Sequence, residues 1–153
     1  MSGAAARIVR AAAVHADCWA RMRTALWPDA SHTDHRTEIA DILATGDGLV
    51  AFVAINATGV AMAFVEAALR HDYVNGCDTS PVLFVEGLYV MPDRRRAGLG
   101  RALIHAVAEW GAEQGCTEMA SDAEMANLSS HAFHQAAGFA ETERVIYFRK
   151  MIG

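Results

Sequence analysis

The stretch RRRAGLGRALIHAVAEW, which begins at Arg94, places a cationic, glycine-containing loop directly before an apolar helical pattern. A helix N-terminus carries unpaired N–H groups and a partial positive charge, so it attracts anions. Gly98 and Gly100 let the phosphates of a ligand approach the backbone without a Cβ in the way. Three arginines can neutralise phosphate charge: Arg95, Arg96 and Arg101. The loop predicts a site for a pyrophosphate-bearing ligand, although a solvated basic turn remains an alternative.

A second group of residues carries the opposite charge. Glu86 lies inside the apolar stretch VLFVEGLYV, where a carboxylate is costly unless it meets a cation or water. Gly87 beside it allows a bulge that would splay the strand. Asp122 and Glu143 flank later strand-like runs and, with Glu86, would form one anionic cleft for a polycation. Weaker candidates for the rim are Glu118, Glu124 and Glu141. Each acid alone is also compatible with a solvated surface position.

The composition limits the class of protein. The chain has 153 residues, which fits one domain, and its net charge of −5 argues against nucleic acid as a general partner. No stretch has the length of a membrane span, and no signal peptide is recognisable at the N-terminus. Cys18, Cys77 and Cys116 have no CxxC spacing and are interpreted as small buried hydrophobes in a reducing compartment. We therefore expect a cytoplasmic protein.

The hydrophobic periodicity predicts the element order β-α-α-β-β-β-α-β-α-β. Strands are expected at 8–13, 49–56, 60–69, 82–91, 117–121 and 145–151, with a hairpin turn at 57–59. Helices are expected at 16–27, 37–44, after the arginines as far as Gly111 or Gly115, and at 127–137. Trp19 and Trp110 have apolar neighbours at helical spacing and are expected in the core.

Two motifs in the right order of elements carry a family resemblance. Residues 95–100, RRAGLG, match [Q/R]-x-x-G-x-[G/A] and resemble the acyl-CoA pyrophosphate loop of the GNAT N-acetyltransferases. Residues 127–130, NLSS, followed by Gly138 and Phe139, resemble the last helix of that family. The segments WARMRTALWPD, EAALRHDYVNGCDTSPVLFVEGLYVMP, EMASDAEMAN and GFAETERVIYFRK resemble the aminoglycoside 6′-N-acetyltransferases, in a branch that typically forms dimers. The resemblance extends from about Trp19 to Lys150.

The resemblance implies a fold and an activity. The fold would be mixed α/β, with a central, mostly antiparallel twisted sheet flanked by helices and splayed at the strand carrying Glu86, in a single domain over 1–153. The activity would be acetylation of the 6′-amine of aminoglycoside antibiotics by direct attack on acetyl-CoA, in a bacterial cytoplasmic homodimer without a metal. Two alternatives stay open: acetylation of polyamines or protein amines, and a non-catalytic acyl-CoA-binding module.

Residue roles follow from the same resemblance. Glu86 would bind the substrate ammonium and provide the route by which its proton leaves. The residues expected at acetyl-CoA are Leu88, Tyr89, Val90, Arg95, Arg96, Ala97, Gly98, Leu99, Gly100, Arg101, Asn127 and His134. The residues expected at the aminoglycoside are Trp27, Tyr73, Glu86, Asp122 and Glu143.

His134 is a departure from the family pattern, because many members carry a tyrosine at this position as a candidate general acid. A histidine could protonate the leaving thiolate or serve only to position its neighbours. His131 and His134 have metal-ligand spacing, but no third ligand is placed to join them, so no metal site is expected.

Overall fold

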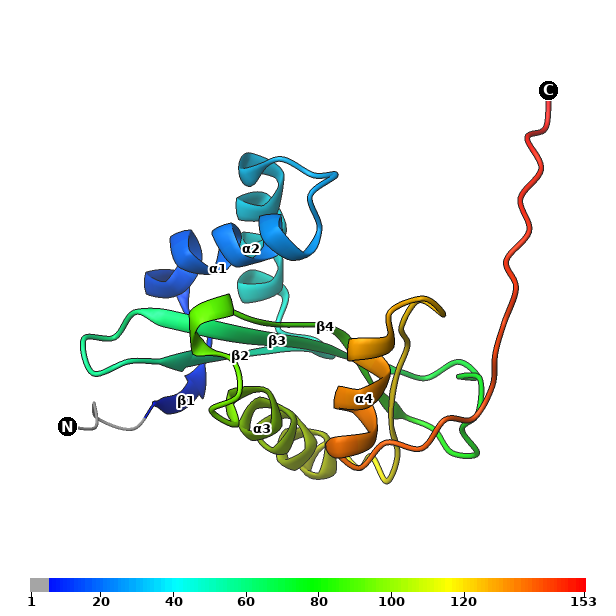
Figure 1. The fold of residues 1–153 in the computed structure, drawn as a ribbon. Helices are drawn as coiled ribbons and strands as arrows, with labels where there is room; N and C mark the ends of the chain where they lie inside the picture. The colour runs from blue at the N-terminus through cyan, green and yellow to red at the C-terminus, as the bar shows by residue number, and fades with distance from the viewer. Residues whose placement is uncertain (1–5) are drawn as a thin grey trace.

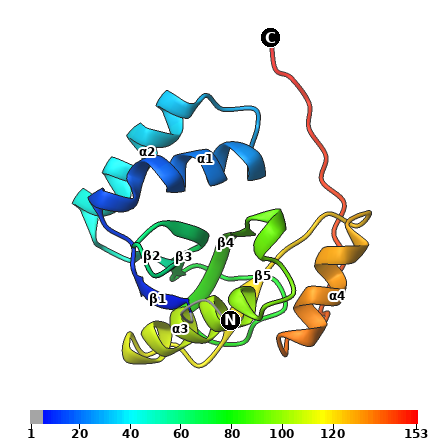
Figure 2. The same ribbon diagram turned by 60° about the vertical axis from the view of Figure 1, so that its left-hand side comes forward.

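The structure, a computed structural model, describes residues 6–153 and consists of one five-stranded sheet with helices on both faces (Figures 1 and 2). The strands are β1 (Arg7–Arg10), β2 (Leu49–Ile55), β3 (Ala61–Arg70), β4 (Val82–Val90) and β5 (Met119–Ser121). The helices are α1 (Ala16–Leu26), α2 (His32–Thr45), α3 (Leu99–Glu113) and α4 (Leu128–Ala136), with 3₁₀ turns η1 (Ala13–His15) and η2 (Pro92–Arg94). Helices α1 and α2 cover one face, and α3 and α4 lie on the other (Figure 2). This mixed α/β architecture confirms the predicted fold class.

The core lies in two layers, one on each face of the sheet. Trp19 and Ile39 pack with Phe64 under α1 and α2, whereas Val65 packs with Leu103 under α3. Phe64 and Val65 are neighbours in β3, and both are 0% exposed. The alternation of side chains along this central strand therefore supplies both layers. Trp19 is fully buried, and Trp110 packs at the edge of the α3 layer, as their helical spacing predicted.

The sheet has the order β1-β2-β3-β4-β5. Its first three pairings are antiparallel, and the hairpin of β2 and β3 is confirmed. The fourth pairing, between β4 and β5, is parallel and short: it runs from Leu83↔Met119 to Val85↔Ser121. The part of β4 after Val85 therefore has β3 on one edge and no strand of the described chain on the other.

Strand β4 contains a bulge at this point. Gly87 pairs with Glu66 and Val85 pairs with Ala67, so Glu86 is an extra residue without a partner in β3. Val85 and Leu88 consequently both pack in the layer under α3, although strict alternation would put residues three apart on opposite faces. The predicted splay at Glu86 is confirmed.

Helix α2 begins earlier than its apolar spacing predicted. It starts at His32 instead of 37, because the Ser31 hydroxyl accepts a hydrogen bond from the Asp34 N–H at 3.0 Å. The Asp34 carboxylate in turn accepts from the Ser31 N–H at 3.3 Å. This reciprocal cap satisfies two N–H groups that would otherwise lack partners.

Two further expectations require correction. The strand predicted at 145–151 is absent: residues 139–153 contain no helix or strand, and the end of the chain extends away from the body (Figure 1). A strand needs an edge to pair with, and strand propensity alone does not supply one. Cys18, Cys77 and Cys116 are free thiols but half-buried instead of fully buried, since each lies at the margin of a core cluster. Within residues 6–153, no helix is both long and apolar enough to cross a membrane.

Candidate active site

The arginine–glycine loop forms the entry to α3. Gly98 is the N-cap residue, with φ at +81°, and no side chain caps the first turn. Arg96 also has a positive φ, at +66°, which is uncommon for a residue with a side chain. Arg96 and Arg101 are exposed. The backbone therefore presents an open helix N-terminus beside free cationic side chains, which suits an anionic ligand.

Arg95 has a different position. Its Nε donates to the Val90 carbonyl at 2.8 Å, and its guanidinium lies 5.4 Å from the centroid of the Tyr89 ring. These contacts tie the loop to the end of β4. The backbone of Leu88, Tyr89 and Val90 is paired with β3 on one edge. On the other edge no strand of residues 6–153 pairs with them.

The two glycines of the loop are required for different reasons. A Cβ on Gly98 would meet nothing within 4 Å, so its positive φ accounts for the glycine. A Cβ on Gly100 would lie 2.9 Å from Cε1 of Phe133. Gly100 is buried and allows α4 to pack closely on α3. The backbone conformation therefore requires a glycine at position 98, and close helix packing requires one at position 100.

A pocket of about 710 Å³ lies between the 71–81 loop, β5, α4 and the start of the C-terminal segment. It brings together three of the predicted residues: Asp122, His134 and Glu143. The weaker acidic candidates also line it: Glu118, Glu124 and Glu141. Glu141 forms an ion pair with Arg144, and the other acids give the pocket a negative wall. A cationic ligand is the chemistry that this wall favours.

Three predicted substrate residues do not line this pocket: Trp27, Tyr73 and Glu86. Tyr73 is 73% exposed in the loop between β3 and β4. The Glu86 carboxylate accepts from Arg70 at 3.0 Å. The expected single cleft is thus divided, because the bulge turns Glu86 away from the pocket walls. Glu86 and Asp122 nevertheless follow the last paired positions of neighbouring strands.

Trp27 lies directly over the bulge. Its Cζ2 and Cη2 atoms are each 2.5 Å from the position that a Cβ on Gly87 would occupy. The indole ring therefore occupies the space that a side chain at position 87 would fill. This contact places an aromatic surface beside the exposed Glu86, an arrangement suited to the apolar face and the ammonium of an amino sugar.

His134 has both ring nitrogens engaged. Nδ1 lies 2.7 Å from the Ser130 carbonyl oxygen, which can only accept, so Nδ1 carries a hydrogen. Nε2 lies 2.8 Å from the Ser121 hydroxyl and, in the neutral ring, accepts its hydrogen. Neutral His134 thus has no free proton to give. Ser121, which sequence reasoning did not select, lines the same pocket.

The comparison with protein families agrees with the loop, the splayed sheet and the element order. The model described as "Acetyltransferase (GNAT) family" matches residues 14–139. The chain belongs to the GNAT acetyltransferase family. Aminoglycoside N(6′)-acetyltransferase type 1 of Serratia marcescens is 52% identical over 137 residues, covering 90% of this chain and 93% of that protein. The same-named protein of Salmonella typhimurium is 49% identical over 136 residues, covering 89% and 92%.

Solved structures of GNAT enzymes are similar over nearly the whole chain. AAC(6′)-Iy in complex with the bisubstrate analogue CoA-S-monomethyl-acetylneamine has a TM-score of 0.89 and 46% identity, covering 96% of this chain and 99% of that one. AAC(6′)-Iy in complex with CoA has a TM-score of 0.93 and 44% identity, covering 99% and 98%.

Two residues of this GNAT chain hold the site in shape. The Asn127 side-chain oxygen accepts from the Ser130 N–H at 3.1 Å and caps α4, the helix that carries His134. Glu118 accepts from the N–H groups of Asp78 and Thr79, at 2.9 and 2.7 Å, and so fastens the 71–81 loop to the start of β5. Among residues 6–153, no three His, Cys, Asp or Glu side chains form a metal-binding group.

The Glu118 anchor predicts a pH dependence of the 71–81 loop. Hydrogen bonds from Thr79 and Asp78 lower the pKa of Glu118 below its ordinary value of 4.5. A lowered pKa means that the folded state favours the ionised form, so the anchor is present above pH 4.5 and is lost as the pH falls through the folded pKa. Amide hydrogen exchange at Asp78 and Thr79 should be slow at pH 6 and should accelerate, after correction for the intrinsic rate, as Glu118 protonates.

Glu118→Gln should accelerate exchange at these amides already at pH 6, with little further change on acidification. Glu113→Gln, an exposed acid at the end of α3, is the matched control. Equal protection in all three proteins at every pH would contradict the anchor.

Proposed function

We propose that this chain transfers the acetyl group of acetyl-CoA to the 6′-amine of aminoglycosides by direct attack, and so confers resistance to these antibiotics. The observation that carries the proposal is the likeness to AAC(6′)-Iy, whose structure holds CoA and acetylneamine joined in one bisubstrate analogue. The opposite charges of the arginine loop and the pocket at Asp122 support it, because one ligand is an anion and the other a polycation.

The geometry of β4 and α3 supports the proposed cofactor residues. Acetyl-CoA places its pyrophosphate at the open N-terminus of α3, where Gly98, Leu99 and Gly100 present N–H groups and Arg96 and Arg101 supply charge. Arg95 and Ala97 shape the loop. The unpaired edge of β4 from Leu88 to Val90 offers backbone groups to the pantetheine and to the thioester oxygen.

The reaction needs a neutral amine, and an alkylamine is mostly protonated near pH 7. Glu86, exposed at the bulge, binds the ammonium in exchange for Arg70 and takes its proton, directly or through a water. Asp122 and Glu143 hold the other ammonium groups of the substrate. His134 delivers a proton toward the leaving thiolate only as imidazolium and through the Ser121 hydroxyl to which it is bonded.

A panel of amines separates this proposal from its alternatives. Release of CoA thiol is measured with acetyl-CoA and kanamycin-type aminoglycosides, polyamines and a lysine-containing peptide. Preferred turnover of the 6′-amino aminoglycosides supports the proposal. A higher kcat/KM for a polyamine or for the peptide would refute the aminoglycoside assignment. It would favour acetylation of polyamines or protein amines, which the acidic pocket also suits. Drug binding without thiol release would establish a non-catalytic binder.

Two substitutions test the division of roles between the acids. Glu86→Gln should lower kcat about 100-fold, the lower end of what a general base contributes. Asp122→Asn should raise KM for the aminoglycoside about tenfold, as loss of one ionic contact of roughly 1.4 kcal/mol would, and leave kcat nearly unchanged. Glu113→Gln, which removes an exposed acid far from the pocket, is the control. An unchanged kcat in Glu86→Gln would remove Glu86 from the mechanism.

The loop is tested by Gly98→Ala. Because φ is +81° and the site is open, the substitution strains the backbone without a clash and disturbs the N–H groups of the first turn. We expect the Kd for CoA, measured by titration calorimetry, to rise about tenfold, while the KM for the aminoglycoside stays within about twofold. Gly115→Ala is a matched control, since it has φ at +93° and equally open surroundings beyond the other end of α3. Equal effects of both substitutions on CoA affinity would refute the assignment.

We also propose that the protein is a cytoplasmic homodimer. Several apolar side chains of the C-terminal segment are largely exposed: Ile146 at 74%, Tyr147 at 85%, Phe148 at 90% and Ile152 at 96%. Exposed apolar side chains gathered in one segment mark an association surface, and a second copy offers a strand partner for this unpaired segment. The half-buried free thiols are compatible with a reducing compartment.

Light scattering after size exclusion tests the dimer. The double substitution Ile146→Asp with Phe148→Asp should convert a dimer into a monomer, because charges cannot be buried without partners. Val14→Asp, at a residue that is 85% exposed in η1, should leave the mass unchanged. A wild-type protein of monomer mass at 100 µM would refute the homodimer.

A further inference from the structure

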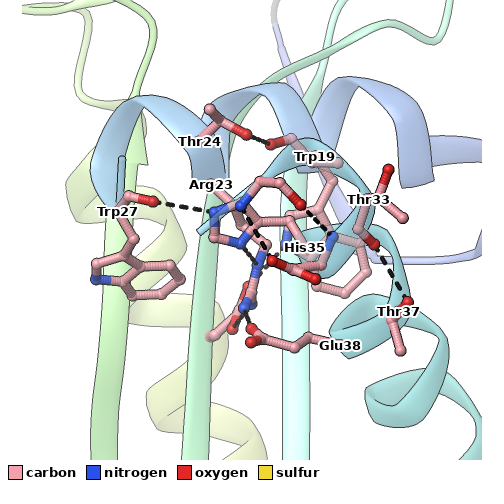
Figure 3. Close-up of polar contacts among 12 residues, drawn as sticks. Trp19, Arg23, Thr24, Trp27, Thr33, His35, Thr37 and Glu38 are labelled. Atoms are coloured by element: carbon pink, nitrogen blue, oxygen red, sulfur yellow. Dashed lines mark hydrogen bonds and ion pairs between the residues drawn. The ribbon is translucent and has the colours of Figure 1, made fainter. Parts of the chain in front are cut away.

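A buried polar network lies under α1 and α2, on the sheet face opposite α3 (Figure 3). Arg23 of α1, His35 of α2 and Glu66 of β3 are 5%, 1% and 6% exposed. The surrounding layer is otherwise apolar, with Ile39 and Phe64 among its members. Charged groups in such surroundings are costly unless every polar atom is satisfied.

The contacts connect the sheet to both helices. Arg23 Nη1 lies 2.5 Å from each oxygen of the Glu66 carboxylate. Trp19 Nε1 donates to Glu66 Oε2 at 2.8 Å, and Arg23 Nη2 bonds to Glu38. Burial raises the pKa of the Glu66 carboxyl, and the contacts with Arg23 and Trp19 oppose that rise. Contacts with Arg23 and Trp19 thus offset part of the free-energy cost of burying the carboxylate.

The network continues from Arg23 to the end of α1. Arg23 Nε donates to His35 Nδ1 at 3.1 Å, so Nδ1 is an acceptor and the ring is neutral. His35 Nε2 carries the hydrogen and donates to the Trp27 carbonyl at 3.0 Å. That carbonyl follows the last residue of α1 and has no helical partner of its own.

The same groups also surround the indole ring of Trp27. The Arg23 guanidinium carbon lies 4.8 Å from the ring centroid. The His35 ring stacks at 6.4 Å with an interplanar angle of 29°, and Phe64 meets the ring edge-on at 6.2 Å. The indole is thereby fixed in the space over Gly87.

A role in stability alone does not account for this network, because buried ion pairs can often be replaced by apolar residues without loss. We propose that Arg23, His35 and Glu66 form a positioning network that fixes Trp27 over the β4 bulge and thereby sets the affinity for the aminoglycoside. The inference rests on the proposed function, which places Trp27 and Glu86 at that substrate. His35 is the key positioning residue, since it joins Arg23 to the Trp27 backbone.

Two substitutions at His35 separate its contacts. In His35→Asn the side-chain oxygen can still accept from Arg23, but the shorter amide does not reach the Trp27 carbonyl. In His35→Gln the amide nitrogen reaches the position of Nε2 and preserves the donor to Trp27. We expect His35→Asn to raise the aminoglycoside KM about tenfold, with kcat and the KM for acetyl-CoA within about twofold. His35→Gln should restore most of the affinity.

A double-mutant cycle tests whether His35 acts through the indole. In a Trp27→Ala background, His35→Asn should have no further effect on the aminoglycoside KM, because the group that it positions is gone. Independent, additive effects of the two substitutions would overturn the proposal. If His35→Asn does not fold, Glu38→Gln provides the same cycle with an expected change of about twofold. The Glu38 side chain is 54% exposed, so its replacement leaves the core intact.

Fluorine NMR provides a readout independent of activity. With 5-fluorotryptophan incorporated, the resonance of Trp27 is assigned by Trp27→Phe. It should shift and broaden in His35→Asn, while that of Trp110 stays unchanged. An unchanged Trp27 resonance would refute positioning by the network. A shifted resonance with an unchanged KM would refute the link to affinity. A wild-type protein that acetylates no aminoglycoside would instead refute the proposed function, while the resonances still report on the network.

Discussion

The extra residue at Glu86 in β4 breaks the regular alternation of the central sheet, and the candidate site is arranged around that break. With one residue too many opposite β3, the strand turns two consecutive positions, Glu86 and Gly87, away from the layer under α3. Pairing with β5 ends at Val85. The rest of β4 therefore keeps unpaired backbone groups along one edge, next to the open N-terminus of α3. The acyl-CoA site proposed above uses the unpaired edge and the open helix N-terminus, and the bulge lies where the pairing between β4 and β5 ends.

The bulge also determines what must lie on it. Gly87 has no side chain, and the indole of Trp27 occupies the space that a Cβ would fill. Hydrogen bonds connect Glu66 of the sheet to Trp27 through Arg23 and His35. The position of the aromatic surface over the bulge therefore depends on polar contacts in the core. The separation of charge follows the same geometry. The cationic loop enters α3 at the end of β4, whereas the acidic pocket is built from β5, α4 and the C-terminal segment. An acidic protein can thus carry a basic loop, because the two charges lie on different elements of the fold.

The features that could be predicted from the sequence are those with local causes. The loop before α3, the hairpin of β2 and β3, and the bulge at Glu86 each follow from a few neighbouring residues, and all three were confirmed. The start of α2 was missed because apolar spacing was given more weight than the Ser31–Asp34 cap. The network could not be predicted, since Arg23 is 43 residues from Glu66 and 12 from His35. Glu66 and Glu86 both follow Phe-Val in a strand, yet Glu66 is buried and Glu86 is exposed, a difference that a short sequence window does not contain.

The C-terminal segment also shows that local sequence alone does not determine whether a strand forms. Its residues Val145 to Met151 have the composition of a strand, yet they pair with none of the described strands, although β5 and the end of β4 have unpaired edges. Strand propensity describes how well a residue fits a sheet that already exists. The same segment contributes Glu143 and Tyr147 to the acidic pocket. Whatever pairs with residues 145–151 must therefore also fix part of the pocket wall. In the proposed homodimer, association and the shape of the substrate site would be two consequences of one ordering event, and neither can be altered without the other.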